Sequence, residues 1–207
     1  MASETPVSAR WLSDEARILF RPYRGYQQVA GEPIDVAPTV LALRRPLMTL
    51  LAIGWFVSMT AAGRLVAWHL GFAAFFWGFL PVYQMIVLTA LFAFFPSPYA
   101  LSWSRRVDLY FSGNGAWYLF MSALVAVCLF APNVYTAMSA LLRYGVLPGA
   151  LLCAFIWSIV VSHAFFRRGC GLSRGRAALA TLLNYLLWPG LIVGYYLLTN
   201  QLQPLMR

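Results

Sequence analysis

Ser112 and His163 are the residues whose side chains could support nucleophilic catalysis in the apolar part of the chain. A hydrolase that works inside a membrane needs a serine beside a histidine base, in a shielded pocket with oxyanion donors. Ser112 opens a Ser-Gly-Asn-Gly turn before one apolar run, and His163 ends another. The same turn residues commonly end a loop and start a helix, and Asp108 is the one acid that could orient the imidazole. A serine hydrolase at Ser112 and His163 is therefore an alternative, not the leading interpretation.

The two histidines, His69 and His163, could also act as axial ligands of a haem iron. His69 is expected at the outer end of one membrane span and His163 at the inner end of another. Most of a ~30 Å hydrocarbon core would then separate them, which excludes one iron bound by both. A pigment with a single axial ligand, at His69 or His163, stays open as an alternative; no other cofactor is expected. No residues have the spacing of metal ligands, so no metal site is predicted.

Three amides, Gln84, Asn133 and Asn184, lie inside apolar runs, where polar groups are costly. The simplest interpretation is hydrogen bonding between helices, typically about 1 kcal/mol for each bond. The alternative is a polar pocket near Pro81 and Pro189, where proline releases backbone carbonyls from the helical ladder. Such a pocket would suit a transporter of small solutes or lipids. A cation-driven pump is not expected, because no carboxylate lies inside an apolar run.

The segment 167–176 is the densest cluster of positive charge, with the sequence RRGCGLSRGR. Arginines near a membrane surface attract anionic lipid head groups, with about 1 kcal/mol for each. We therefore predict that the arginines of this segment bind lipid or a protein partner: Arg167, Arg168, Arg174 and Arg176. An acidic partner, or a role in fixing the topology alone, are the alternatives.

Apolar helices are the elements that must hold these residues. The chain has 207 residues, 61% hydrophobic and 10% charged, whereas soluble domains are about 45–50% apolar and about 25% charged. Apolar runs of about twenty residues match the length that crosses a ~30 Å hydrocarbon core. The sequence predicts an all-α polytopic membrane bundle of five transmembrane helices and no nucleic-acid partner. The expected spans are about 47–66, 72–95, 116–138, 146–166 and 177–198.

The first 45 residues are the only stretch with the composition of a soluble segment. Ser13 is expected to cap a short amphipathic helix that Pro22 ends, lying flat in the membrane interface. Three prolines in 31–46 predict a stiff connector. We therefore expect a cytoplasmic or interfacial segment at 1–45 and a five-helix transmembrane domain at 46–207.

The arginines orient the bundle. With the N-terminus inside, three of the fifteen basic residues fall in outer segments (Arg64, Arg143 and Arg207) and the other twelve in inner ones. Positive charge collects on the cytoplasmic side of membrane proteins. We therefore expect a multi-pass protein of the bacterial cytoplasmic (inner) membrane, with a cytoplasmic N-terminus, a periplasmic C-terminus and no cleavable signal peptide.

Two short motifs resemble the Yip domain family, five-span membrane proteins related to the Ypt-interacting proteins. They are GLSRGRA at 171–177, which opens the last expected helix, and LFRP at 19–22, before the first. The five-span plan with a polar cytoplasmic N-terminus is similar to that family as well. The resemblance implies an all-helical bundle that acts through protein or lipid contacts and has no catalytic residues to transfer.

The leading interpretation is a non-catalytic membrane scaffold or accessory subunit that packs against other membrane proteins, lipids or pigments. Fifteen phenylalanines, eight tryptophans and eleven tyrosines are more aromatic residues than five short-looped helices can bury among themselves. Aromatic residues and arginine are enriched where proteins contact partners. The expected partners are membrane lipids, including anionic head groups, and other membrane proteins, and catalysis is not expected.

Overall fold

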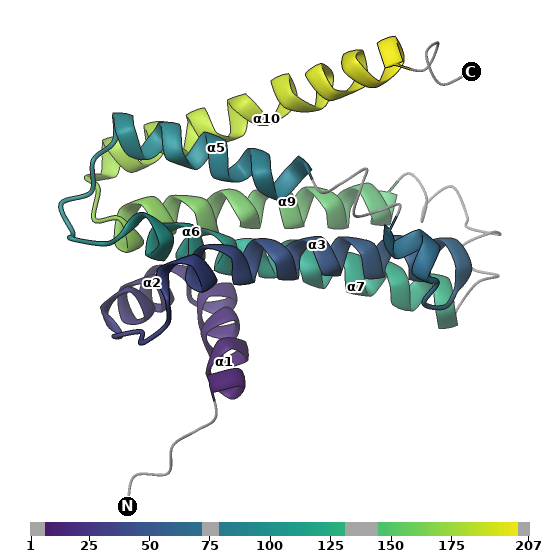
Figure 1. Cartoon of the computed structure of the whole chain (residues 1–207), viewed down its shortest axis with the longest axis horizontal. Helices are drawn as coiled ribbons and strands as arrows, with labels where there is room; N and C mark the ends of the chain where they lie inside the picture. The colour runs from purple at the N-terminus through teal and green to yellow at the C-terminus, as the bar shows by residue number, and fades with distance from the viewer. Residues whose placement is uncertain (1–6, 72–78, 131–144, 203–207) are drawn as a thin grey trace, which may run out of the picture.

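The structure is a computed structural model that describes residues 7–71, 79–130 and 145–202. Over these residues the chain forms helices and no strand (Figure 1), so the all-α prediction is confirmed. The elements are α1 (Val7–Phe20), α2 (Pro22–Gly31), α3 (Pro38–Ala62), α5 (Phe79–Phe94), α6 (Trp103–Phe111), η1 (Ser112–Asn114), α7 (Gly115–Phe130), α9 (Leu147–Ala164), η3 (Phe165–Gly169) and α10 (Arg174–Leu202).

Three helical stretches are long and apolar enough to cross a membrane: Pro38–Thr60, Trp103–Phe130 and Leu147–Gly169. They overlap the spans expected at 47–66, 116–138 and 146–166, and they indicate an integral membrane protein. The other two expected spans correspond to α5, a shorter apolar helix, and to the middle of α10. The helix of α10 continues through residues 188–190, which include Pro189.

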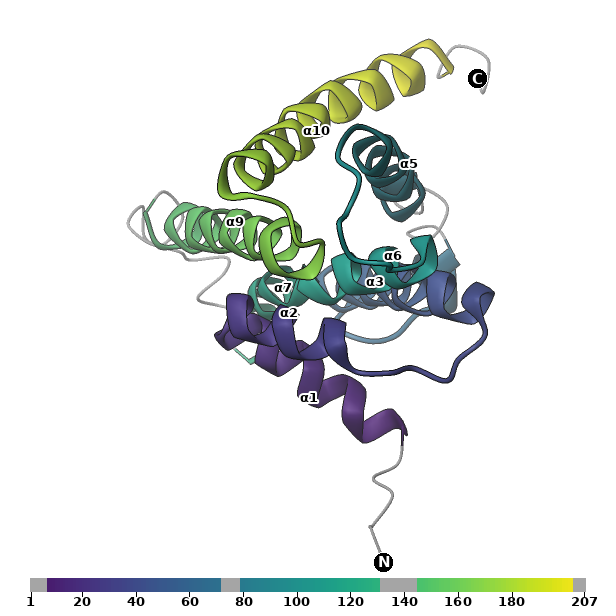
Figure 2. The same cartoon turned by 90° about the vertical axis from the view of Figure 1, so that its left-hand side faces the viewer.

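The long helices lie side by side in alternating directions, so their connections gather at two ends of the bundle (Figure 1). The start of α3, the α5–α6 connection and the α9–α10 connection gather at the end that carries α1 and α2, which faces the viewer in Figure 2. We call this the basic end, because its segments contain these arginines: Arg44, Arg45, Arg105, Arg106, Arg167, Arg168, Arg174 and Arg176. The opposite end holds the end of α3 and the start of α9.

Two predictions about the N-terminal segment were wrong. Helix α1 begins at Val7, so Ser13 lies inside it and does not cap it. The predicted connector at 31–46 was too long, since only residues 32–37 are non-helical and α3 begins at Pro38. Pro38 sits in the first turn, where its missing N–H has no helical partner to lose, and Pro46 lies inside α3 beside the buried pair Arg44 and Arg45.

The core lies at the basic end and includes the N-terminal helices. Tyr26 of α2 is fully buried, and its ring packs edge-on against Phe165, which also contacts Tyr110 of α6. Helices α1 and α2 approach so closely that a Cβ on Gly25 would lie 2.8 Å from Cα of Ile18. The N-terminal segment therefore packs into the bundle as a helical hairpin.

Candidate functional site

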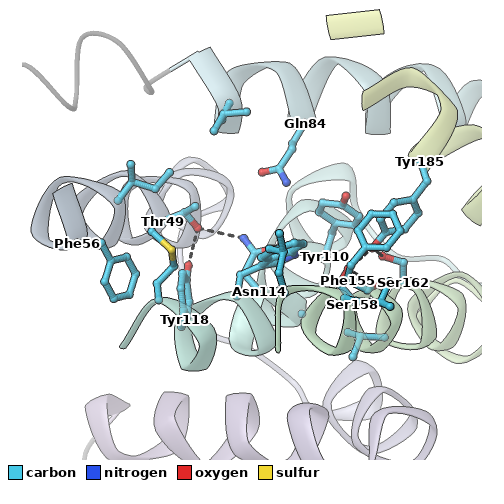
Figure 3. Close-up of a pocket in the computed structure, with 18 of the residues that line it drawn as sticks. Thr49, Phe56, Gln84, Tyr110, Asn114, Tyr118, Phe155, Ser158, Ser162 and Tyr185 are labelled. Atoms are coloured by element: carbon cyan, nitrogen blue, oxygen red, sulfur yellow. Dashed lines mark hydrogen bonds between the residues drawn. The ribbon is translucent and has the colours of Figure 1, made fainter. Parts of the chain in front are cut away.

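An apolar cavity of about 850 Å³ lies among α3, α5, α7, α9 and α10 (Figure 3). This volume falls within the ~300–1,000 Å³ range typical of small-molecule sites. Side chains such as Phe56, Trp117 and Leu151 line it, and the described lining contains no charged residue. The cavity therefore suits a ligand that is largely hydrocarbon and uncharged, because a buried charge there would have no partner.

One group of hydroxyls on the cavity wall joins α3 to α7 (Figure 3). Thr49 Oγ1 lies 2.7 Å from Tyr118 Oη and accepts from Asn114 Nδ2 at 3.3 Å. The Thr49 hydroxyl donates to the carbonyl of Arg45 at 3.0 Å, so the Tyr118 phenol is the donor to Thr49. These bonds hold the polar groups in fixed positions on an otherwise apolar wall.

A second group joins α9 to α10. Tyr185 Oη donates to Ser158 Oγ at 2.8 Å and lies 3.3 Å from Ser162 Oγ. Ser158 in turn donates to the carbonyl of Phe155. Since the two groups come from different helices of the wall, they offer a ligand neutral hydrogen-bonding partners at two places in the cavity.

The three amides predicted to form a polar pocket have different positions. Gln84 projects from α5 into the cavity (Figure 3). Asn184 is buried and exchanges hydrogen bonds of 3.1 and 3.2 Å with the phenol of Tyr110, which lines the cavity. Asn133 lies outside the described residues. The structure thus places Gln84 at the cavity and Asn184 one side chain behind it.

A buried ion cluster at the basic end surrounds Asp108, whose side chain is 0% exposed. Its carboxylate accepts from Arg44 at 2.6 and 2.7 Å, from Arg45 at 3.0 Å and from Arg105 at 3.1 Å. Asp108 lies outside the spans expected from the sequence, and the structure places it in α6. The capping signal that could have revealed this helix is Ser102, whose hydroxyl accepts from the Arg105 amide at 3.2 Å.

The N-terminal hairpin is tied to this cluster by charge. Glu15 of α1 forms an ion pair of 3.0 Å with Arg45, and Arg105 donates to the carbonyl of Val29 in α2. Burial raises the pKa of Glu15 to about 7, and the positive charge of Arg45 opposes this shift. Burial raises the pKa of Asp14 as well. The acids of α1 thus face α3 and α6.

A second pocket, which we call the basic pocket, opens at the basic end with a volume of about 590 Å³. Its chemical groups are supplied by α2, α9, η3 and α10: Tyr23, His163, Arg167, Arg168 and Arg174. His163 Nδ1 lies 2.7 Å from Tyr23 Oη, and Arg167 donates to the carbonyl of Leu172 at 2.7 Å. Arg176, predicted with the other three arginines, does not line the pocket, and its guanidinium lies 6.0 Å from the ring centre of Phe95.

Ser112 and His163 have separate partners. The Ser112 hydroxyl is buried and donates to the carbonyl of Leu109 at 2.5 Å, while the His163 imidazole bonds to Tyr23. No hydrogen bond joins the two in the part of the chain that the structure describes. The arrangement therefore lacks the nucleophile–base pair that the hydrolase alternative needs.

His69 lies in the segment 67–71 that follows α3, where the neighbouring Leu70 packs against Gly54 of α3, whereas His163 lies in the last turn of α9 at the basic end. The Nδ1 atom of His69 is buried and has no hydrogen-bond partner. Within the described ranges no group of three or more His, Cys, Asp or Glu residues could hold a metal ion. A shared haem iron would have to bridge the length of the bundle, which its two axial bonds of about 2 Å cannot do.

Comparison with known proteins gives no relative: no protein-family model, no curated protein and no solved structure matches the chain. The resemblance to the Yip domain family therefore stays a prediction.

Proposed function

We propose that this protein binds a neutral membrane lipid in the cavity among α3, α5, α7, α9 and α10, without chemically transforming it. The observation that carries the proposal is the cavity itself. It has a volume of about 850 Å³, and its wall is largely hydrocarbon with uncharged hydroxyl groups held in place by hydrogen bonds. A lipid in the surrounding bilayer is the ligand in ready supply for such a space. Its hydrocarbon would fill the apolar volume, and a carbonyl or hydroxyl would meet the polar groups.

The polar groups on the wall set the chemistry of this ligand. Tyr118 donates to Thr49, and Tyr185 donates to Ser158, so their phenol oxygens retain acceptor capacity. The Gln84 amide offers both donors and an acceptor. A ligand with one or two uncharged oxygen functions on a long hydrocarbon body fits this set.

We also propose that five helices cross the cytoplasmic membrane of a bacterium, and that the protein acts as an accessory subunit. Large apolar side chains remain exposed on the outer faces, among them Phe94 at 77% and Phe130 at 86%. Membrane lipid or another membrane protein must cover them. The lipid in the cavity would then be held for, or presented to, such a partner.

The test is to purify the protein in mild detergent, extract it with organic solvent and identify the retained lipid by mass spectrometry. A neutral lipid at a fixed ratio to protein is expected from the wild type. Met121→Trp fills the cavity from α7 and is expected to remove most of that lipid. Leu119→Trp changes an exposed residue of the same helix and should retain it.

The two variants make the result specific to the cavity. Equal retention by Met121→Trp and the wild type would mean that the lipid sits elsewhere, on the outer surface. Absence of any lipid at fixed ratio from the wild type would contradict the proposed function.

A further inference from the structure

Charges at the basic end are divided between two places. The ion pairs of the described residues all lie in or beside the buried ion cluster, where carboxylates meet Arg17, Arg44, Arg45 and Arg105. The three arginines of the basic pocket form no ion pair with a carboxylate of the described chain. Like charges held together without a counter-ion repel one another. A bound anion would relieve this repulsion.

The chemistry of the basic pocket selects among anions. Guanidinium groups present parallel N–H donors that match the oxygens of phosphate, and pairs of this kind are short and strong. Arg167 and Arg168 come from η3, while Arg174 comes from the first turn of α10. Cations from two elements thus line one space. We propose that the basic pocket binds the phosphate group of an anionic membrane lipid.

Two further side chains complete the pocket. His163 and Tyr23 fix each other through the 2.7 Å bond between Nδ1 and the phenol oxygen. With one ring nitrogen so engaged, the other nitrogen of His163 can donate to an anion when it carries a proton. Arg167 is held in place by its bond to the Leu172 carbonyl. Part of the pocket is therefore ordered before the phosphate arrives, which lowers the entropic cost of binding.

The position of the pocket favours a lipid as the source of the phosphate. The membrane-spanning stretch Leu147–Gly169 ends at this pocket, which places it at the depth of the lipid head groups. Beside it, at the junction of α1 and α2, Phe20 is 72% and Tyr23 is 40% exposed. Aromatic side chains of this kind are common at membrane interfaces, and basic pockets between helices on the cytoplasmic side bind phosphorylated head groups.

The test uses the full-length protein in detergent and measures the dissociation constant of a short-chain phosphatidic acid. Phosphatidylcholine with the same chains is the neutral comparison, and inorganic phosphate is the soluble one. Arg174→Gln removes a cation that lines the pocket, and we expect about tenfold weaker binding of phosphatidic acid from the loss of charge-assisted bonds. Arg176→Gln removes the same charge two residues away, outside the pocket, and should leave the constant within about twofold.

The result that supports the proposal is tight binding of phosphatidic acid, weak binding of phosphatidylcholine and a loss confined to Arg174→Gln. Equal weakening by Arg174→Gln and Arg176→Gln would show diffuse attraction to the surface and would overturn the site. Inorganic phosphate that binds as tightly as phosphatidic acid would overturn the lipid source. Because Arg174 does not line the apolar cavity, retention of neutral lipid should be unchanged in Arg174→Gln, so the two proposals can fail separately.

Discussion

Asp108 shows how much of the fold rests on one side chain. Its carboxylate forms ion pairs with Arg44, Arg45 and Arg105, and it shares Arg45 with Glu15. Removing a buried counter-ion leaves its partners as uncompensated charges, which costs far more than the pair contributes when intact. The carboxylate therefore holds three helices, α3, α6 and, through Glu15 and Arg45, α1, in one arrangement.

We expect Asp108→Asn to destabilise the protein by about 3–5 kcal/mol, the range for breaking a buried ion pair. The asparagine keeps the shape of the side chain and loses its charge, so the effect reports electrostatics and not packing. The measurement is the midpoint of denaturant unfolding of the detergent-purified protein. Asp35→Asn removes an equal charge from an exposed position and should change stability by less than about 0.5 kcal/mol. Matching midpoints for the two variants would mean that the cluster is not buried as described.

At the scale of elements, the approach of α1 to α2 depends on the absence of a side chain at one position. An added Cβ at Gly25 would lie 2.8 Å from the carbonyl oxygen of Arg17 and 2.8 Å from Cα of Ile18. Both are backbone atoms and cannot move without moving the helix. Gly31, at the end of α2, has nothing within 4 Å of its added Cβ.

Gly25→Ala should therefore force α1 away from α2 and cost about 1–3 kcal/mol, as overpacking does. We expect faster trypsin cleavage at the arginines of the hairpin, Arg17, Arg21 and Arg24, because local opening exposes them. Gly31→Ala makes the same chemical change in open space and should leave the cleavage rate unchanged. If both variants are cleaved at the wild-type rate, the two helices do not pack as closely as described.

The sequence supports the prediction of elements better than that of their contacts. Hydropathy alone finds the three spanning stretches, because a run of about twenty apolar residues matches the thickness of the hydrocarbon core of a membrane. It misses α6, whose charged residues give no apolar run, although Ser102 offers a capping signal. It also misses the pairing of Arg44 with Asp108, 64 residues apart. Nothing local to either residue reveals that contact, and Tyr23 likewise joins His163 only because α2 folds back on α9.

At the scale of the whole molecule, the course and the lengths of the helices bear on the proposed five crossings of the membrane. Helix α3 leads away from the basic end and α6 begins there again, so the chain must return through α5 (Figure 1). The 16 residues of α5 span about 24 Å, somewhat less than a ~30 Å hydrocarbon core. The 29 residues of α10 span about 43 Å, which is ample. These lengths support five crossings, with α5 as the shortest.

We therefore expect Arg64→Cys and Arg207→Cys to lie outside and Gly31→Cys to lie inside, each in a chain whose native Cys128, Cys153 and Cys170 are replaced by serine. A membrane-impermeant maleimide should label the first two variants in cells with an opened outer membrane, and the third only after lysis. Arg207→Cys decides whether α10 crosses, because a helix lying along the inner surface would keep that thiol inside. Arg64→Cys tests the crossing of α3 independently. Positive charge concentrated at the basic end predicts that this end lies in the cytoplasm, so position 64, beyond the other end of α3, should lie outside. Labelling of Gly31→Cys before lysis would show the opposite orientation. The basic pocket would then lie on the periplasmic side, away from the anionic lipids of the inner leaflet that it is proposed to bind.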